Sequence, residues 1–188
     1  MSQSFETYPV HVAGVERHLR LFEIKPGVKI AVLNILGDTE FVQAVAKELA
    51  AKLRAFKADV LLTPETKSIP LAHALSVELG MPYIVLRKSY KPYMGDALRA
   101  ETLSITTGQP QILLLDEKDK TLLANKRVIL LDDVISTGST LQGMRLILDK
   151  AHGISVAEAA IFTEGDRAKW SDVVALGHLP VFVDENKV

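Results

Sequence analysis

Short runs of apolar residues and helically spaced apolar positions alternate along the chain. The runs at 59–63, 82–86 and 128–131 are continuous, which is typical of parallel strands buried on both faces. Apolar residues recur every three or four positions after Asp38 and after Gly138, and this spacing predicts helices that begin at those points. A third helix is expected between the strands at 59–63 and 82–86, starting near Pro70 and stopping at Gly80.

Weaker patterns complete the order of elements. Two hairpins are predicted, one turning at Ala13-Gly14 and one at Gly108-Gln109-Pro110. Short strands are expected at 30–33 and 156–162, and a last apolar stretch covers 179–183. The order strand, helix, strand, helix, strand, hairpin, strand, helix, strand predicts an α/β fold with a doubly wound, mostly parallel sheet. The amino-terminal hairpin forms a smaller attachment, and the tail is a second candidate for it.

Composition narrows the class of partner. The net charge of −1 gives no electrostatic reason to expect a nucleic acid or an anionic membrane surface. The absence of cysteine excludes disulfides, a thiol nucleophile and thiolate metal sites, and it suits the cytoplasm. The first ten residues do not read as a signal peptide, and the sequence contains no apolar run long enough to span a membrane. We therefore expect a cytoplasmic protein with a small-molecule ligand.

The stretch "VILLDDVISTGST" at 128–140 carries the strongest chemical signal. It predicts a buried strand that ends in Asp132 and Asp133, followed by a hydroxyl-rich turn, Ser136 to Thr140, at the start of a helix. A turn of backbone N–H groups at a helix N-terminus binds phosphate, and Gly138 lets the backbone come close. Two carboxylates beside a phosphate site are useful when the ligand also carries hydroxyls or Mg²⁺, as ribose 5-phosphate can. The alternative is a capped helix behind a solvated strand end.

These residues resemble the ribose-phosphate signature of the type I phosphoribosyltransferases, which bind phosphoribosyl pyrophosphate (PRPP). Residues 59–91, with a glutamate-containing loop and an Arg-Lys pair after the next strand, resemble the adenine and xanthine members. The resemblance implies transfer of ribose 5-phosphate to a purine base with Mg²⁺, by a homodimer. It also implies a single domain over 1–188, with a hood over about 1–35 that helps to build the base pocket and a core over 36–188.

The resemblance also assigns roles to single residues. Asp132 and Asp133 would hold the ribose hydroxyls, with Mg²⁺ carried by PRPP near them. The 5-phosphate would lie against Ser136, Thr137, Gly138, Ser139 and Thr140. Pyrophosphate would be bound by Glu65, Thr66, Lys67, Ser68, Arg87, Lys88 and Lys91.

The sequence leaves open both the general base and the identity of the purine. Glu65 and Glu101 are the candidates for the general base that accepts the purine proton. The polar stretch 89–103 has the length of a mobile lid. Adenine members carry a tyrosine and a glutamate where this chain has 105–107, Ile-Thr-Thr, and this segment is closer to the xanthine members. The identity of the purine therefore stays open, with adenine first and xanthine or hypoxanthine next.

Two other functions share part of the pattern. Phosphorelay receiver domains also place two aspartates after an apolar strand, but too few residues follow 133 to form the remaining βα units of that fold. The second hypothesis is a PRPP-binding regulator, because some transcription regulators share the fold of the type I phosphoribosyltransferases. The segment ahead of residue 59 shows no basic recognition helix, and the net charge of −1 gives an RNA-binding regulator little support.

Overall fold

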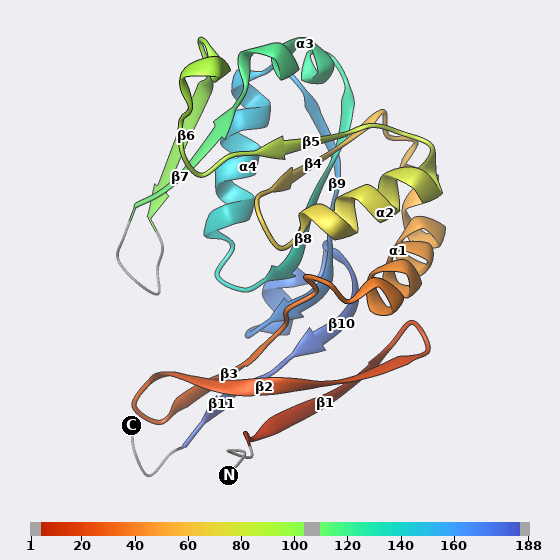
Figure 1. The fold of residues 1–188 in the computed structure, drawn as a ribbon, viewed down its shortest axis with the longest axis vertical. Helices are drawn as coiled ribbons and strands as arrows, with labels where there is room; N and C mark the ends of the chain where they lie inside the picture. Colours follow the sequence, from red (N-terminus) through yellow and green to blue (C-terminus); the bar gives the residue numbers. More distant parts are fainter. Residues whose placement is uncertain (1–4, 104–109, 185–188) are drawn as a thin grey trace.

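A five-stranded parallel sheet forms the centre of the protein in the computed structural model, which describes residues 5–103 and 110–184 (Figure 1). The strands lie in the order β10-β9-β8-β4-β5. Their bounds are β4 Val60–Pro64, β5 Tyr83–Leu86, β8 Arg127–Ile135, β9 Ile154–Glu164 and β10 Val174–Leu179. The predicted α/β fold with a mostly parallel sheet is confirmed.

Strand β8 is apolar without alternation because both of its faces are covered. Ile129 and Leu131 pack in the cluster that contains α1 and α2, whereas Val128 and Leu130 pack on the opposite side with α4. All four side chains are fully buried. The uninterrupted run therefore follows from a strand held between two helical layers.

The helices begin and end close to the predicted positions. α1 spans Thr39–Leu53, and its N-cap, Asp38, accepts a hydrogen bond from the backbone N–H of Phe41 at 3.2 Å. α2 ends at Gly80, which adopts φ 68°. The other helices are α2 Ile69–Leu79, α3 Lys120–Leu123 and α4 Ser139–Lys150, and the 3₁₀ turns are η1 Arg54–Phe56, η2 Pro92–Met94, η3 Glu117–Asp119 and η4 Arg167–Trp170. No helix in the described part of the chain has the length and apolar character needed to span a bilayer.

A four-stranded antiparallel sheet, the hood, lies across the end of the core where β8 gives way to α4 (Figure 1). Its order is β1-β2-β3-β11, with β1 Thr7–Val12, β2 Val15–Lys25, β3 Val28–Val32 and β11 Val181–Val183. The predicted turn at Ala13-Gly14 is confirmed, with both residues at positive φ. Both the strand predicted at 30–33 and the tail belong to this hood. The predicted hood of about 1–35 contains that strand, whereas the predicted element order placed it with the parallel sheet.

The second hairpin packs on α4 and corrects one prediction. Its strands are β6 Leu98–Leu103 and β7 Pro110–Leu115. Of the predicted turn at Gly108-Gln109-Pro110, Pro110 begins β7 and the other two residues lie outside the described part of the chain. Residues 98–103 were expected in a mobile lid, but they form a paired strand in which Ala100 and Thr102 are buried. Backbone hydrogen bonds between Arg87 and Leu114 in both directions fasten this hairpin to the end of β5.

Candidate functional site

A small hollow lies at the turn between β8 and α4, where the sequence predicts a phosphate site. Its volume is about 80 Å³. A water molecule takes up about 30 Å³ in the liquid, so the hollow has room for more than one water or for a small anionic group. It is lined by Asp132, Val134, Ile135, Ser136, Thr137, Gly138, Thr140 and Leu141. The hollow therefore brings together residues of the predicted ribose and phosphate sites.

Asp132 is the more deeply buried of the two aspartates. Asp132 is buried at the end of β8 and accepts a hydrogen bond from the backbone N–H of Asp133 at 2.9 Å. Burial, followed by the negative charge of Asp133, raises the pKa of Asp132 well above its usual value. The positive charge of Lys88 acts in the opposite direction, which places this predicted pyrophosphate ligand within electrostatic reach of Asp132.

The turn that follows is held from behind by one segment, residues 164–170. The Ser136 hydroxyl donates to the carboxylate of Glu164 at 2.6 Å, and Lys169 Nζ donates to the carbonyl of Thr137 at 2.8 Å. Gly138, at φ 86°, lies so close to Trp170 that an added Cβ would come within 2.6 Å of the indole ring. Three consecutive turn residues are thus each fixed by a different residue of this segment.

The hydroxyls at the start of α4 are not helix caps. The N-cap is Gly138, which has no side chain, so the alternative in which Ser139 or Thr140 only caps the helix does not describe the turn. Both hydroxyls instead contact the carboxamide of Gln111 on β7. Thr140 lines the hollow, and Ser139 lines a separate cleft on the other side of the turn.

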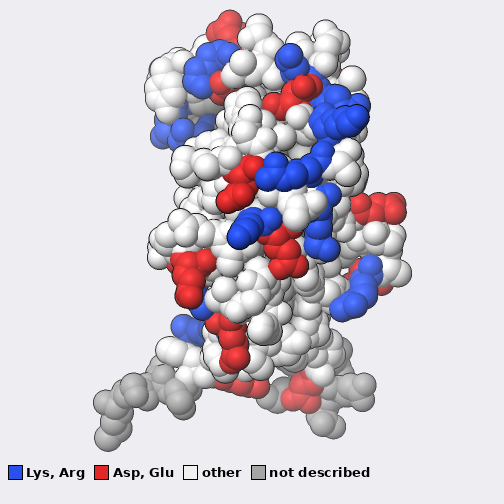
Figure 2. Space-filling view, turned by 90° about the vertical axis from the view of Figure 1, so that its right-hand side faces the viewer, with Lys and Arg blue, Asp and Glu red and all other residues white. Residues whose placement is uncertain are grey.

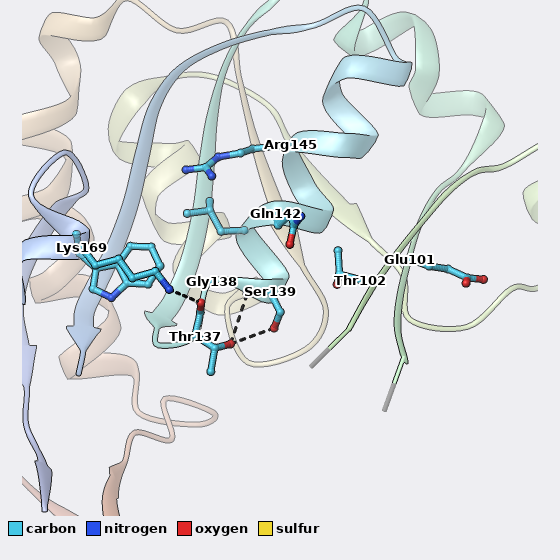
Figure 3. Close-up of a pocket in the computed structure, with 10 residues that line it drawn as sticks. Glu101, Thr102, Thr137, Gly138, Ser139, Gln142, Arg145 and Lys169 are labelled. Atoms are coloured by element: carbon cyan, nitrogen blue, oxygen red, sulfur yellow. Dashed lines mark hydrogen bonds between the residues drawn. The ribbon is translucent and has the colours of Figure 1, made fainter. Parts of the chain in front are cut away.

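That cleft, of about 690 Å³, opens between η4 and the β6–β7 hairpin over the first turns of α4 (Figure 3). Figure 3 shows Lys169 bonded to Thr137 and Thr137 bonded in turn to Ser139. The predicted base Glu101 lies on the hairpin side of this cleft and pairs with Arg99. Glu101 is therefore outside the hollow that contains Asp132.

The loop after β4 forms a second group of predicted residues. Glu65 accepts a hydrogen bond from the backbone N–H of Lys88 at 2.6 Å, and Arg87 Nε lies 2.6 Å from its other oxygen in an ion pair without hydrogen-bond alignment. The peptide bond between Glu65 and Thr66 is cis. This loop is thus joined to the Arg-Lys pair after β5, as expected if both serve one ligand.

The other predicted pyrophosphate ligands are less concentrated. Lys67 Nζ donates to the carbonyl of Leu33 at 3.2 Å, and the buried Ser68 hydroxyl donates to the carbonyl of Pro64 at 2.8 Å. Thr66 is exposed, as is Lys91 just before η2. The side chains of Lys67 and Ser68 therefore have partners within the protein. Their contact with pyrophosphate stays a prediction.

The sequence reading missed Glu164, Gln111, Lys169 and Trp170. Glu164 had a usable signal, because it follows the apolar stretch of β9 and the ends of parallel strands meet at one edge of the sheet. Gln111 and Lys169 had none, since their contacts with the turn join elements about 30 residues apart in the chain.

Comparison with known proteins defines the class. The sheet order, the hood and the β8–α4 turn form a type I phosphoribosyltransferase fold, and an adenine phosphoribosyltransferase structure from Thermoanaerobacter pseudethanolicus ATCC 33223 matches it with a TM-score of 0.71 at 22% identity, over 85% of this chain and 95% of that one. The phosphoribosyl transferase domain family matches residues 32–177. The chain belongs to this family.

Relatives of two kinds are similar in sequence. The xanthine phosphoribosyltransferase of Stutzerimonas stutzeri (strain A1501) is 31% identical over 134 residues, 71% of this chain and 70% of the relative. The purine biosynthesis transcriptional repressor PurR of Bacillus subtilis (strain 168) is 28% identical over 143 residues, 76% of this chain. The chain spans about half (49%) of the length of that repressor.

Proposed function

We propose that this protein transfers the ribose 5-phosphate group of PRPP to a purine base and releases pyrophosphate. The observation that carries the proposal is the hollow at the β8–α4 turn, where the buried Asp132 and the hydroxyl of Thr140 line one small cavity. A carboxylate accepts from sugar hydroxyls, and backbone N–H groups at a helix N-terminus bind a phosphate. A sugar phosphate presents both groups in one molecule.

The residues present also fit Mg²⁺. Mg²⁺ in proteins is bound through one or two carboxylates, with waters and substrate phosphates as its other ligands. The described residues contain no cluster of three or more His, Cys, Asp or Glu side chains placed for a metal, whereas Asp132 and Asp133 supply two carboxylates. When bound, the ion would offset the negative charge that develops on pyrophosphate.

The reaction breaks the bond between ribose C1 and the pyrophosphate oxygen and forms a bond from C1 to a purine nitrogen. The electron pair leaves with pyrophosphate, so positive groups near it lower the barrier. Arg87, Lys88 and Lys91 supply that charge, and the loop Glu65–Ser68 supplies backbone N–H groups. The nitrogen loses its proton to a general base, for which Glu65 and Glu101 are the candidates. Glu65 pairs with the guanidinium of Arg87 and accepts from the backbone N–H of Lys88, so it lies beside the groups assigned to pyrophosphate.

The finer assignment is adenine first, with xanthine or hypoxanthine next, in cytoplasmic purine salvage by a homodimer. One domain covers 1–188, with the hood over about 1–35, to which the tail adds β11, and the core over the rest of 36–188. A hood at the end of the parallel strands is placed to enclose a base against the ribose site (Figure 1).

The test is to incubate the protein with PRPP, Mg²⁺ and, in separate reactions, adenine, hypoxanthine, guanine, xanthine and orotate. Nucleotide and pyrophosphate are then measured in each reaction. We expect turnover with at least one purine and none with orotate. Turnover with orotate alone would contradict the purine assignment.

A second candidate function is a PRPP-binding regulator. The similarity to purine biosynthesis regulators favours it. Acidic and basic side chains interleave on the face shown in Figure 2, so that face carries mixed charge. Tight binding of PRPP without turnover of any base in the panel would favour the regulator over the enzyme.

A further inference from the structure

Gln111 lies against the start of α4, although it belongs to the β6–β7 hairpin. Its Nε2 donates to the hydroxyl oxygen of Thr140 at 3.0 Å. Its Oε1 lies within reach of two hydroxyl donors, Thr140 at 3.3 Å and Ser139 at 3.4 Å. One half-buried carboxamide therefore serves both hydroxyls of the first helical turn.

The hydrogen-bonding capacity of a hydroxyl decides what this contact does. A threonine hydroxyl has one proton to donate and two lone pairs that accept. When Gln111 Nε2 occupies a lone pair of Thr140, the proton of Thr140 can rotate between Gln111 Oε1 and the hollow that Thr140 lines. An anion in the hollow attracts that proton, and Nε2 still holds the oxygen in place.

Ser136 provides the contrast. Its proton is donated to the carboxylate of Glu164 at 2.6 Å, so its hydroxyl can offer an anion only lone pairs. Of the two hydroxyls, the one on Thr140 is the available donor to a phosphate. The expectation that the Ser136 side chain itself donates to the 5-phosphate loses support, and its backbone N–H remains.

We propose that Gln111 is a positioning residue for the sugar phosphate, acting through Thr140. In this role it holds the Thr140 hydroxyl and takes no part in the bonds that break and form. The inference rests on the proposed function, because it requires the hollow to take a phosphate monoester. It also means that the β6–β7 hairpin and the turn 136–140 act together, because Gln111 on the hairpin holds the Thr140 hydroxyl at the start of α4.

The experiment is a double-mutant cycle measured by titration calorimetry with ribose 5-phosphate, on the parent, Gln111→Leu, Thr140→Val and the double variant. We expect Gln111→Leu to weaken binding about five- to tenfold, as a lost hydrogen bond would. The double variant should bind no more weakly than Thr140→Val alone, because Gln111 acts through that hydroxyl. Losses that multiply in the double variant would overturn the proposal, as would parent-like binding by Gln111→Leu.

Two further variants separate positioning from folding. Gln142→Leu makes the same chemical change on the exposed side of α4, and it should bind ribose 5-phosphate within about twofold of the parent. Gln111→Glu keeps the size of the side chain but replaces the donor with a negative charge, so it should bind more weakly than Gln111→Leu. Parent-like binding by Gln111→Glu would also overturn the proposal.

The outcomes of this experiment distinguish a failure of the Gln111 proposal from a failure of the proposed transferase function. If the parent fails to bind ribose 5-phosphate and PRPP, both proposals fall together. If the parent binds and the cycle shows no coupling, only the role of Gln111 falls. If coupling is found but no base is turned over, Gln111 stands and the protein is a binder of sugar phosphates rather than a transferase.

Discussion

Burial of Asp132 disfavours its charged form. Asp132 is 8% exposed, and burial together with the neighbouring charge of Asp133 raises its pKa. Between the unfolded and the folded pKa, the native protein binds more protons than the unfolded chain. The stability that Asp132 contributes is therefore fully present below the unfolded pKa and is lost as the pH rises through the folded pKa. Buried carboxylates of this kind gather at functional sites.

Asp132→Asn should therefore stabilise the ligand-free protein at neutral pH while weakening PRPP binding. Removing the buried charge is expected to raise Tm at pH 7.5 by about 2–4 °C, the shift produced by roughly 1 kcal/mol in a domain of this size. The gain should shrink at pH 4, because protonation of the parent carboxyl removes the same buried charge. Thermal unfolding followed by circular dichroism at both pH values measures it, and a Tm difference that does not depend on pH would contradict the assignment.

Asp133→Asn tests the ribose contact in a less buried position. Asp133 is half-buried, so its replacement should leave the fold intact and change Tm less than Asp132→Asn does. PRPP affinity should fall about tenfold, because a hydrogen bond between a carboxylate and a sugar hydroxyl is lost. Calorimetric titration with PRPP and Mg²⁺ gives the comparison. A titration that matches the parent would remove Asp133 from the ribose site.

At the scale of elements, the turn 136–140 between β8 and α4 depends on how closely η4 packs behind it. Gly138→Ala is expected to cost about 2–4 kcal/mol, from a side chain at φ 86° and from the contact with Trp170. Gly165→Ala is the matched control, because Gly165 has φ 85° but nothing within 4 Å of an added Cβ, and it should cost about 1–2 kcal/mol. Urea unfolding of both variants gives the difference, and equal losses would mean that Trp170 does not confine the turn.

The elements found from the sequence are those whose signal is local. The run at 128–131 and the helix after Gly138 were predicted because burial on two faces and helical spacing are visible within a few residues. β10 was missed because five of its six residues are only half-buried and Gly177 interrupts the run. The predicted element order placed β3 with the parallel sheet, but β3 pairs with β2 on one side and with β11, from the other end of the chain, on the other, with Val181 opposite Ile30.

In the site, too, the local features were predicted and the contacts between distant segments were not. Asp132 to Thr140 are contiguous, so one strand–turn–helix pattern revealed the whole turn. The side chains that hold this turn come from other elements, and only the fold brings them to it. Ser136 meets Glu164 across 28 residues of sequence, and Lys169 meets Thr137 across 32. Sequence reasoning therefore found the part of the site that would bind the ligand but missed the part that fixes its geometry.

At the scale of the whole molecule, one arginine joins the hood to the core. Arg17 on β2 donates to both carboxylate oxygens of Asp38, at 2.7 and 2.9 Å, and to Glu40 at 2.8 Å. Asp38 is also the N-cap of α1, so the same carboxylate orders the first turn of a core helix. The hydrogen bond from Arg17 lowers the pKa of Asp38, and burial partly opposes this. The orientation of the hood is thus linked to the charge of one side chain.

Asp38→Ala should loosen the hood and cost stability in a pH-dependent way. The loss is expected to be about 1–2 kcal/mol at pH 7, the usual value of an N-cap. Because the folded pKa of Asp38 lies below its unfolded value, the stability it contributes is present above the unfolded pKa and lost as the pH falls through the folded one. The difference between parent and variant in urea unfolding should therefore shrink from pH 7 to pH 3. A difference that stays constant would show that the charge of Asp38 contributes nothing.

A charge-removing variant of the same residue tests whether the hood and the β8–α4 turn have separate roles. Asp38→Asn keeps a capping side chain but loses the charge that binds Arg17, so α1 should stay ordered while the hood gains freedom. If the hood encloses the base and the β8–α4 turn holds the sugar phosphate, this variant should raise KM for the purine several-fold and leave ribose 5-phosphate affinity unchanged. Asp96→Asn, which breaks the exposed pair with Lys120, is the control and should change neither. An equal loss of base and sugar phosphate binding in Asp38→Asn would mean that the hood and the turn do not act as separate halves of the site.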